Sequence, residues 1–95
     1  METLIGEYEI SLGGEPPALT ILHLIRGNLA ARFGGNEIAE LRELLAVEQK
    51  RIRTLGSYQL IFGASGDMAV YHQNGQRNAY FNADQIAALR RFLGN

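Results

Sequence analysis

The stretch AYFNADQIAALRRFL, residues 79–93, closes the chain and nearly repeats ARFGGNEIAELRELL, residues 31–45. At an offset of 48, the identical pairs are Ala31/Ala79, Phe33/Phe81, Ile38/Ile86, Ala39/Ala87, Leu41/Leu89, Arg42/Arg90 and Leu45/Leu93. Further upstream, YEISLGG at 8–14 matches YQLIFGA at 58–64. We interpret the pattern as a tandem duplication, which predicts two halves related by pseudo-twofold symmetry. Two copies are too few for a solenoid, which needs at least three stacked units.

Length and composition predict one small domain. The chain has 95 residues, of which 46% are hydrophobic and 20% charged, so it has enough apolar material to fold. A copy of about 45 residues would have difficulty building a core alone. We therefore expect residues 1–95 to form a single domain made of two repeats, about 1–55 and 56–95.

The compartment is predicted from what the sequence lacks. Cysteine is absent, which excludes disulfides and thiolate metal sites and favours a reducing environment. The start METLIGEYEI has no signal-peptide pattern, and no apolar run approaches the roughly 20 residues that span a bilayer. We expect a cytoplasmic protein without a membrane partner.

Alternating apolar residues predict three strands in each half. In the first half, Leu4 to Leu12 reads as one half-buried strand, residues 19–25 as a second strand and Leu29 to Phe33 as a third. In the second half, the strands are 57–62, 68–73 and 77–81, with the hairpin signal NG at 74–75.

Each half then predicts a helix. The first helix would run from GGNEI at 34–38 to about Arg53, with Gly56 ending it and the cations Lys50, Arg51 and Arg53 near its carboxyl end. The second helix would start after the N-cap Asn82, with Gln85 completing a capping box. The fold class is thus α+β, a tandem βββα duplication with an antiparallel sheet covered by two helices.

The strand at 19–25, LTILHLI, is apolar on both faces and should be central. If both helices pack on one face of the sheet, the other face lacks cover. A homodimer would supply the missing layer.

The chain carries no recognisable catalytic or metal-binding pattern. His23 and His72 are the only histidines, and neither has a second ligand at a metal-site spacing. We expect His23 to be a buried imidazole with its hydrogen bonds satisfied. No serine or threonine stands in a nucleophile motif, and the glutamates read as solvated surface. These patterns predict a non-enzymatic protein without catalytic residues, metal or cofactor.

One group of residues suggests a ligand surface. It comprises Tyr71, His72, Arg77, Tyr80, Arg90 and Arg91. Aromatic rings beside cations can stack exposed bases and bind phosphates. The order of strands and helix, repeated in tandem, resembles the Whirly and purine-rich-element-binding families of single-stranded DNA proteins, which use four strands per unit. A net charge of −1 argues against strong binding to a phosphate backbone.

Three functions follow in order of preference. The first is a small interaction module that self-associates through a sheet face and binds an unidentified protein or small molecule. The second is single-stranded nucleic-acid binding through the aromatic and basic residues just named. The third is a ligand-binding protein or enzyme with a pocket between the sheet and the helices.

Overall fold

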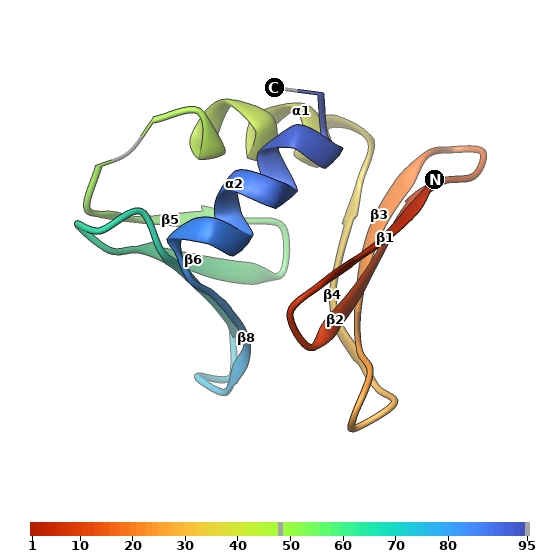
Figure 1. The fold of residues 1–95 in the computed structure, drawn as a ribbon, viewed down its shortest axis with the longest axis horizontal. Helices are drawn as coiled ribbons and strands as arrows, with labels where there is room; N and C mark the ends of the chain where they lie inside the picture. The colour runs from red at the N-terminus through yellow and green to blue at the C-terminus, as the bar shows by residue number, and fades with distance from the viewer. Residues whose placement is uncertain (48, 95) are drawn as a thin grey trace.

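The protein is an α+β fold with two antiparallel sheets of four strands and two helices (Figure 1). The computed structural model describes residues 1–47 and 49–94. The first sheet contains β1 (Glu2–Ile5), β2 (Tyr8–Gly13), β3 (Ala18–His23) and β4 (Leu29–Gly34), and α1 (Gly35–Leu45) follows it. The second sheet contains β5 (Arg51–Leu55), β6 (Tyr58–Phe62), β7 (Met68–His72) and β8 (Arg77–Phe81), and α2 (Ala83–Phe92) follows it. In Figure 1, the helices lie above and between the two sheets.

Each half has four strands, where the sequence patterns predicted three. The stretch predicted as one strand from Leu4 to Leu12 is a hairpin, in which Ile5 pairs with Tyr8 across a two-residue turn. Gly6 begins that turn with φ 59°, a left-handed conformation that glycine adopts without steric cost. Because of the turn, Leu4 lies on the exposed face and Ile5 is buried, so the predicted position of Leu4 on the apolar face was wrong.

The second missed strand is β5. We predicted a helix running to about Arg53, but α1 ends at Leu45 and residues 51–55 pair with β6. Gly56 lies in the β5–β6 turn with φ 60°, so it ends a strand and not a helix. Arg51 nevertheless serves the end of α1, because its guanidinium donates hydrogen bonds to the backbone oxygens of Leu44 and Val47.

The core lies between the sheets and under the helices. Each sheet turns one face inward, and both helices contribute a buried apolar stripe. The largest fully buried side chains include Phe33 and Phe81, one from the last strand of each sheet. Burying an apolar side chain of this size contributes roughly 1.5–3 kcal/mol. No helix within residues 1–47 and 49–94 is long and apolar enough to cross a membrane.

The first turn of each helix is fixed by its cap. Asn82 and Gln85 form the predicted capping box, with both hydrogen bonds at 2.9 Å. At α1, the Glu37 carboxylate accepts the N–H of Gly34 at 3.0 Å, which is the half of the box that glycine allows. Each of these side chains also covers a hairpin turn of the other sheet: a Cβ on Gly6 would collide with Gln85, and one on Gly56 with Glu37.

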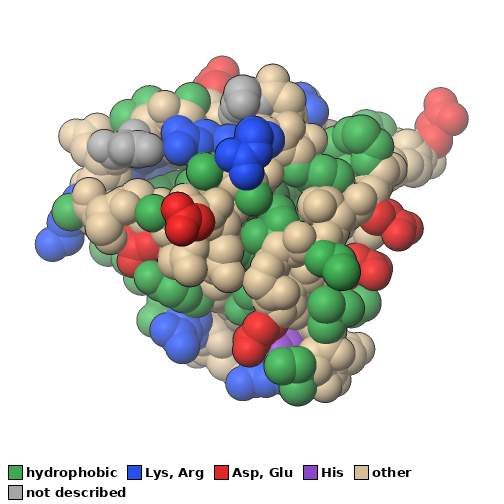
Figure 2. Space-filling model, in the orientation of Figure 1, with side chains coloured by type: hydrophobic (Ala, Val, Ile, Leu, Met, Phe, Trp, Pro, Cys, Tyr) green, Lys and Arg blue, Asp and Glu red, His purple; other side chains and the backbone are tan. Residues whose placement is uncertain are grey.

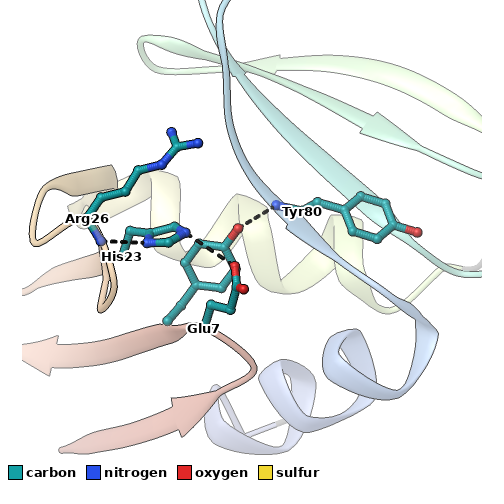
Figure 3. Close-up of polar contacts among 5 residues, drawn as sticks. Glu7, His23, Arg26 and Tyr80 are labelled. Carbon is teal, nitrogen blue, oxygen red and sulfur yellow. Dashed lines mark hydrogen bonds and ion pairs between the residues drawn. The ribbon is translucent and has the colours of Figure 1, made fainter.

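Two tyrosines join the sheets. The Tyr8 hydroxyl, from the first sheet, accepts the backbone N–H of Tyr80 on β8 at 3.0 Å (Figure 3). The Tyr58 hydroxyl, from the second sheet, accepts the backbone N–H of Arg32 on β4 at 3.1 Å. β4 and β8 are edge strands, so the N–H groups that point away from the neighbouring strand have no partner in their own sheet. The N–H groups of Arg32 and Tyr80 have the tyrosine hydroxyls as their acceptors instead. Each sheet therefore satisfies an edge donor of the other.

Other contacts between the halves surround these hydrogen bonds. The Tyr8 ring lies 4.9 Å from the Phe81 ring, centre to centre, and the Tyr58 ring lies 5.2 Å from the Phe33 ring. The Asn78 amide on β8 donates to the backbone oxygen of Ala30 on β4 at 3.0 Å. The halves are thus packed and hydrogen-bonded to each other along the facing edges of the sheets.

Replacing either bridging tyrosine by phenylalanine is expected to destabilise the fold. Tyr8→Phe and Tyr58→Phe keep the ring and leave an edge N–H without its acceptor, at a cost of about 1 kcal/mol each. Urea unfolding of the purified variants measures this loss. The matched control is Tyr71→Phe, since the Tyr71 hydroxyl has no hydrogen bond with the described residues. Equal stability of all three variants would contradict the bridging role.

Candidate functional site

The six residues predicted as a binding surface lie in three places. Tyr71, Arg77 and Tyr80 share the outer face of the second sheet, which is turned away from the helices. His72 lies on β7 with its ring against Tyr58, at the other face of that sheet. Arg90 and Arg91 are on α2, where they line a shallow groove with Ala46 and Ala87. The structure therefore brings three of the six together, and we call these three residues the tyrosine face.

The register of the second sheet explains this grouping. Tyr71 pairs with Arg77, and Tyr80 pairs with Ala69 in the next row on the same face. Side chains of directly opposed residues lie on one face of a sheet within contact distance. The Arg77 guanidinium lies 5.8 Å from the centre of the Tyr80 ring, and Tyr80 is 40% exposed. Ile52 and Ile61 continue the row of Tyr80 across the sheet.

An acidic residue also contacts the tyrosine face. The Tyr80 hydroxyl donates a hydrogen bond to the Asp67 carboxylate at 2.8 Å, and the Ser65 hydroxyl donates to the same carboxylate at 3.1 Å. The bond from Tyr80 lowers the pKa of Asp67 below its ordinary 3.8. The same bond raises the pKa of Tyr80 above its ordinary 10.0. A negative charge at this position repels a phosphate group approaching Tyr80.

The two histidines have defined hydrogen bonds. His23 is buried, its Nδ1 accepts the Arg26 backbone N–H at 3.2 Å, and its Nε2 lies 3.3 Å from the Glu7 carboxylate (Figure 3). The prediction of a satisfied, buried His23 is thus confirmed. His72 accepts the Asn74 backbone N–H on its Nδ1 at 3.3 Å. Among the described residues, no cluster of His, Asp or Glu has the arrangement of a metal site.

Sequence patterns missed a second surface, on the outer face of the first sheet. Leu4 pairs with Glu9, Glu9 with Leu22, and Leu22 with Leu29, so these four residues form one row across the sheet. We call Leu4, Leu22 and Leu29 the leucine row. Leu4 is 66% exposed and Leu29 is 50% exposed. The turn at Gly6 is the signal that would have placed Leu4 correctly.

The β3–β4 turn extends the apolar character of this face. Leu24 and Ile25, predicted as part of a strand, follow the end of β3 and are 45% and 76% exposed. The neighbouring row of the sheet is polar and contains Glu2, Ser11, Thr20 and Arg32. Figure 2 shows hydrophobic and acidic side chains interspersed on the side of the molecule formed by the first sheet.

A cavity lined by residues of α1, β6 and α2, among them Leu45, Phe62 and Ile86, has a volume of about 10 Å³. That volume is about what one water molecule needs. A ligand pocket there would therefore require the core to open.

Comparisons with protein-family models, with curated proteins and with solved structures gave no match for this chain. The resemblance in element order to the Whirly and purine-rich-element-binding families stays an expectation from the sequence. The sequence patterns predicted three strands before each helix, where those families have four. The structure has four strands before each helix.

The bond between Tyr80 and Asp67 predicts a measurable pH dependence. Because the folded pKa of Asp67 is lowered, the bond contributes stability above pH 4 or so and loses that contribution as the pH falls through the folded pKa. Because the folded pKa of Tyr80 is raised above its ordinary 10.0, the contribution is present up to about pH 10 and is lost as the pH rises through that folded pKa. Tyr80→Phe should therefore raise the pKa of Asp67 towards 3.8.

A carbon-detected NMR titration of the Asp67 carboxyl group measures this shift, and Tyr71→Phe is the control that should leave it unchanged. An Asp67 titration that is identical in Tyr80→Phe and the parent protein would show that the bond does not form.

Proposed function

We propose that the protein is a non-enzymatic interaction module that self-associates through the outer face of its first sheet. The observation that carries this proposal is the leucine row, in which Leu4 and Leu29 are exposed, on a sheet face that the other described residues leave uncovered. An apolar patch bordered by polar residues is typical of a protein–protein interface. The second sheet presents only Ile52 as a comparably exposed aliphatic residue among those described.

The pattern of the first sheet suits a twofold dimer. A twofold axis parallel to the strands, between β2 and β3, places β1 of one copy opposite β4 of the other. The row then faces itself in reverse order, with Leu4 opposite Leu29 of the second copy. Glu9, which lies between Leu4 and Leu22 in the row, faces Leu22 of the second copy, so the interface includes one carboxylate from each chain. In the polar row, Glu2 faces Arg32 of the second copy, so opposite charges meet at both ends of the interface.

We also propose that the two halves arose by duplication and are related by pseudo-twofold symmetry. The contacts between the halves support this proposal, because they occur in matched pairs. Tyr8 and Tyr58 are 50 positions apart, and their backbone donors Tyr80 and Arg32 are 48 apart. If the halves arose by duplication, the outer faces of the two sheets have since diverged, and the leucine row is found on the first sheet.

Charge reversal tests the proposed dimer. Light scattering should give the parent protein twice the mass of one chain. Glu2→Arg and Arg32→Glu should each raise the dissociation constant of the dimer at least about fivefold, because each places like charges opposite one another. The double variant Glu2→Arg/Arg32→Glu should restore dimerisation. Ile52→Glu, on the second sheet, is the control that should leave the mass unchanged.

Two results would reject the dimer. One is a parent protein that stays monomeric at every concentration studied. The other is a dimer that Ile52→Glu disrupts while Glu2→Arg does not, because the second sheet would then form the interface.

A second candidate function is single-stranded nucleic-acid binding at the tyrosine face. The observation that favours it is the grouping of Tyr71, Arg77 and Tyr80 on one open sheet face. Bases can stack on the rings while the guanidinium binds a phosphate. The Asp67 carboxylate beside Tyr80 and the net charge of −1 oppose tight binding, which places this function second.

Fluorescence anisotropy with short single-stranded DNA and RNA at two salt concentrations tests the second candidate. Tyr71→Ala should weaken binding by roughly 1–3 kcal/mol for one lost stacking contact. Arg77→Ala should weaken binding and reduce its salt dependence. Arg91→Ala, on α2, should change neither the binding affinity nor its salt dependence. Binding that depends on Arg91 and not on Tyr71 would move the site to the helix and reject the tyrosine face.

A further inference from the structure

A polar cleft of about 260 Å³ opens where the β3–β4 turn meets the β7–β8 turn. Its polar lining comes from Arg26, Asn28, His72, Asn74, Gln76 and Asn78. We call it the turn cleft. Both halves line it. In Figure 1, the β3–β4 turn and the turn that leads into β8 lie at the end of the molecule opposite the helices. In Figure 2, Lys and Arg side chains gather both over the helices and, separately, at this end.

Hydrogen bonds within the β7–β8 turn leave donor groups for the cleft. The Nδ1 atom of His72 accepts the Asn74 N–H, so a neutral His72 carries its proton on Nε2 as a donor. The amide oxygen of Asn74 accepts the Gln76 N–H at 2.9 Å, which leaves the Asn74 NH₂ group as a donor. Two side-chain acceptors of the turn, on His72 and Asn74, are thus used within the turn, and the donor groups of the same two side chains remain for a ligand.

Arg26 adds a permanent positive charge. Its backbone N–H is bonded to His23, while its guanidinium makes no hydrogen bond or ion pair with any residue in 1–47 or 49–94. Figure 3 shows the Arg26 side chain extending away from the pair formed by His23 and Glu7. No carboxylate lines the turn cleft within the described residues. Glu7 lines an adjoining cleft of about 140 Å³, which shares Arg26 and Asn78 with the turn cleft, and its carboxylate lies 3.3 Å from His23 Nε2.

Asn78 holds the two sides of the cleft together. Its amide donates to the backbone oxygen of Ala30 at 3.0 Å, which joins β8 to β4 at the wall of the cleft. The cleft is therefore held in place by a hydrogen bond between the sheets, and its shape does not depend on the turns alone.

We infer that the turn cleft binds a phosphate group. A phosphate presents several acceptor oxygens and a negative charge, which match a guanidinium, an imidazole N–H and side-chain amides. The cleft volume is near the lower end of ligand sites, so it accommodates the phosphate with a small attached group. The phosphate could belong to a free phosphate ester or to the backbone of a single strand that passes the cleft. This site goes beyond the proposed self-association. Arg77 and Tyr80 of the tyrosine face do not line it, but they line the adjoining cleft that shares Arg26 and Asn78 with it.

NMR titration with inorganic phosphate, in buffer of low chloride concentration, tests the site. The backbone amide signals of Asn28, Asn74 and Gln76 should shift and saturate. Arg26→Gln should weaken binding about tenfold, which is the loss of one charge-assisted hydrogen-bond pair. Asn28→Asp, which places a carboxylate in the cleft, should weaken binding at least as much. Arg53→Gln removes an exposed arginine from β5 and is the matched control.

Two further titrations separate the sources of the phosphate. Competition by ribose 5-phosphate but not by a short oligothymidylate indicates a free ester. Competition by the oligothymidylate that is lost in Arg26→Gln and kept in Tyr71→Ala indicates a strand backbone. Shifts that do not saturate, or equal affinity in Arg26→Gln, Asn28→Asp and the parent protein, would overturn the proposal. Light scattering of Arg26→Gln and Asn28→Asp tests the phosphate site independently of the proposed dimer. Both variants should keep the mass of the parent protein, so a loss of phosphate binding would not be due to a loss of dimerisation.

Discussion

The structure depends on how the backbone N–H groups at the edges of two strands, β4 and β8, find hydrogen-bond acceptors. An exposed row of N–H and C=O groups at a sheet edge invites pairing with other chains. Here the edges of β4 and β8 face each other, and tyrosine hydroxyls bind one N–H group on each. These hydrogen bonds join residues 26 and 72 positions apart. Each sheet therefore needs the other, and we expect neither half to fold by itself.

This arrangement determines which surfaces stay open. The inner faces of both sheets and the apolar stripes of both helices are used in one core. The described residues, 1–47 and 49–94, leave the outer faces of both sheets uncovered. These two faces differ, because the first carries the leucine row and the second carries the tyrosine face. Where the two halves meet at their turns, the surface is polar and rich in donors. The three surfaces suit three kinds of contact, namely an apolar self-interface, a stacking face and an anion site.

Much of the fold could be predicted from local sequence signals. The strands β6, β7 and β8 and the capping box at Asn82 follow from alternation and cap chemistry, because neighbouring residues decide them. The β1–β2 turn was missed since a two-residue turn preserves an apparent alternation of apolar residues. The strand β5 was missed because its residues 51–55 carry two arginines and few apolar side chains, and its pairing with β6 is a contact between separate segments.

The candidate site was harder to predict, because its residues come together through contacts between separate segments of the chain. Tyr71, Arg77 and Tyr80 are close in sequence and on paired strands, so a hairpin prediction could group them. Arg90 and Arg91 follow closely in sequence, yet the helix carries them to another part of the surface. The turn cleft joins residues about 48 positions apart, and the leucine row depends on the register of four strands. The turn cleft forms only when the halves are placed together, and the leucine row forms only when the four strands of the first sheet are paired in register.

The most direct measurement of the proposed self-association is disulfide formation between introduced cysteines. The sequence contains no cysteine, so every disulfide must involve the introduced residues. Chains carrying Leu4→Cys or Leu29→Cys would be oxidised separately and as an equal mixture. In the proposed dimer these positions face each other across the interface, so the mixture should form a disulfide between one chain of each kind, in excess of either variant alone. No disulfide in the mixture, or equal amounts in all three samples, would contradict association through the leucine row.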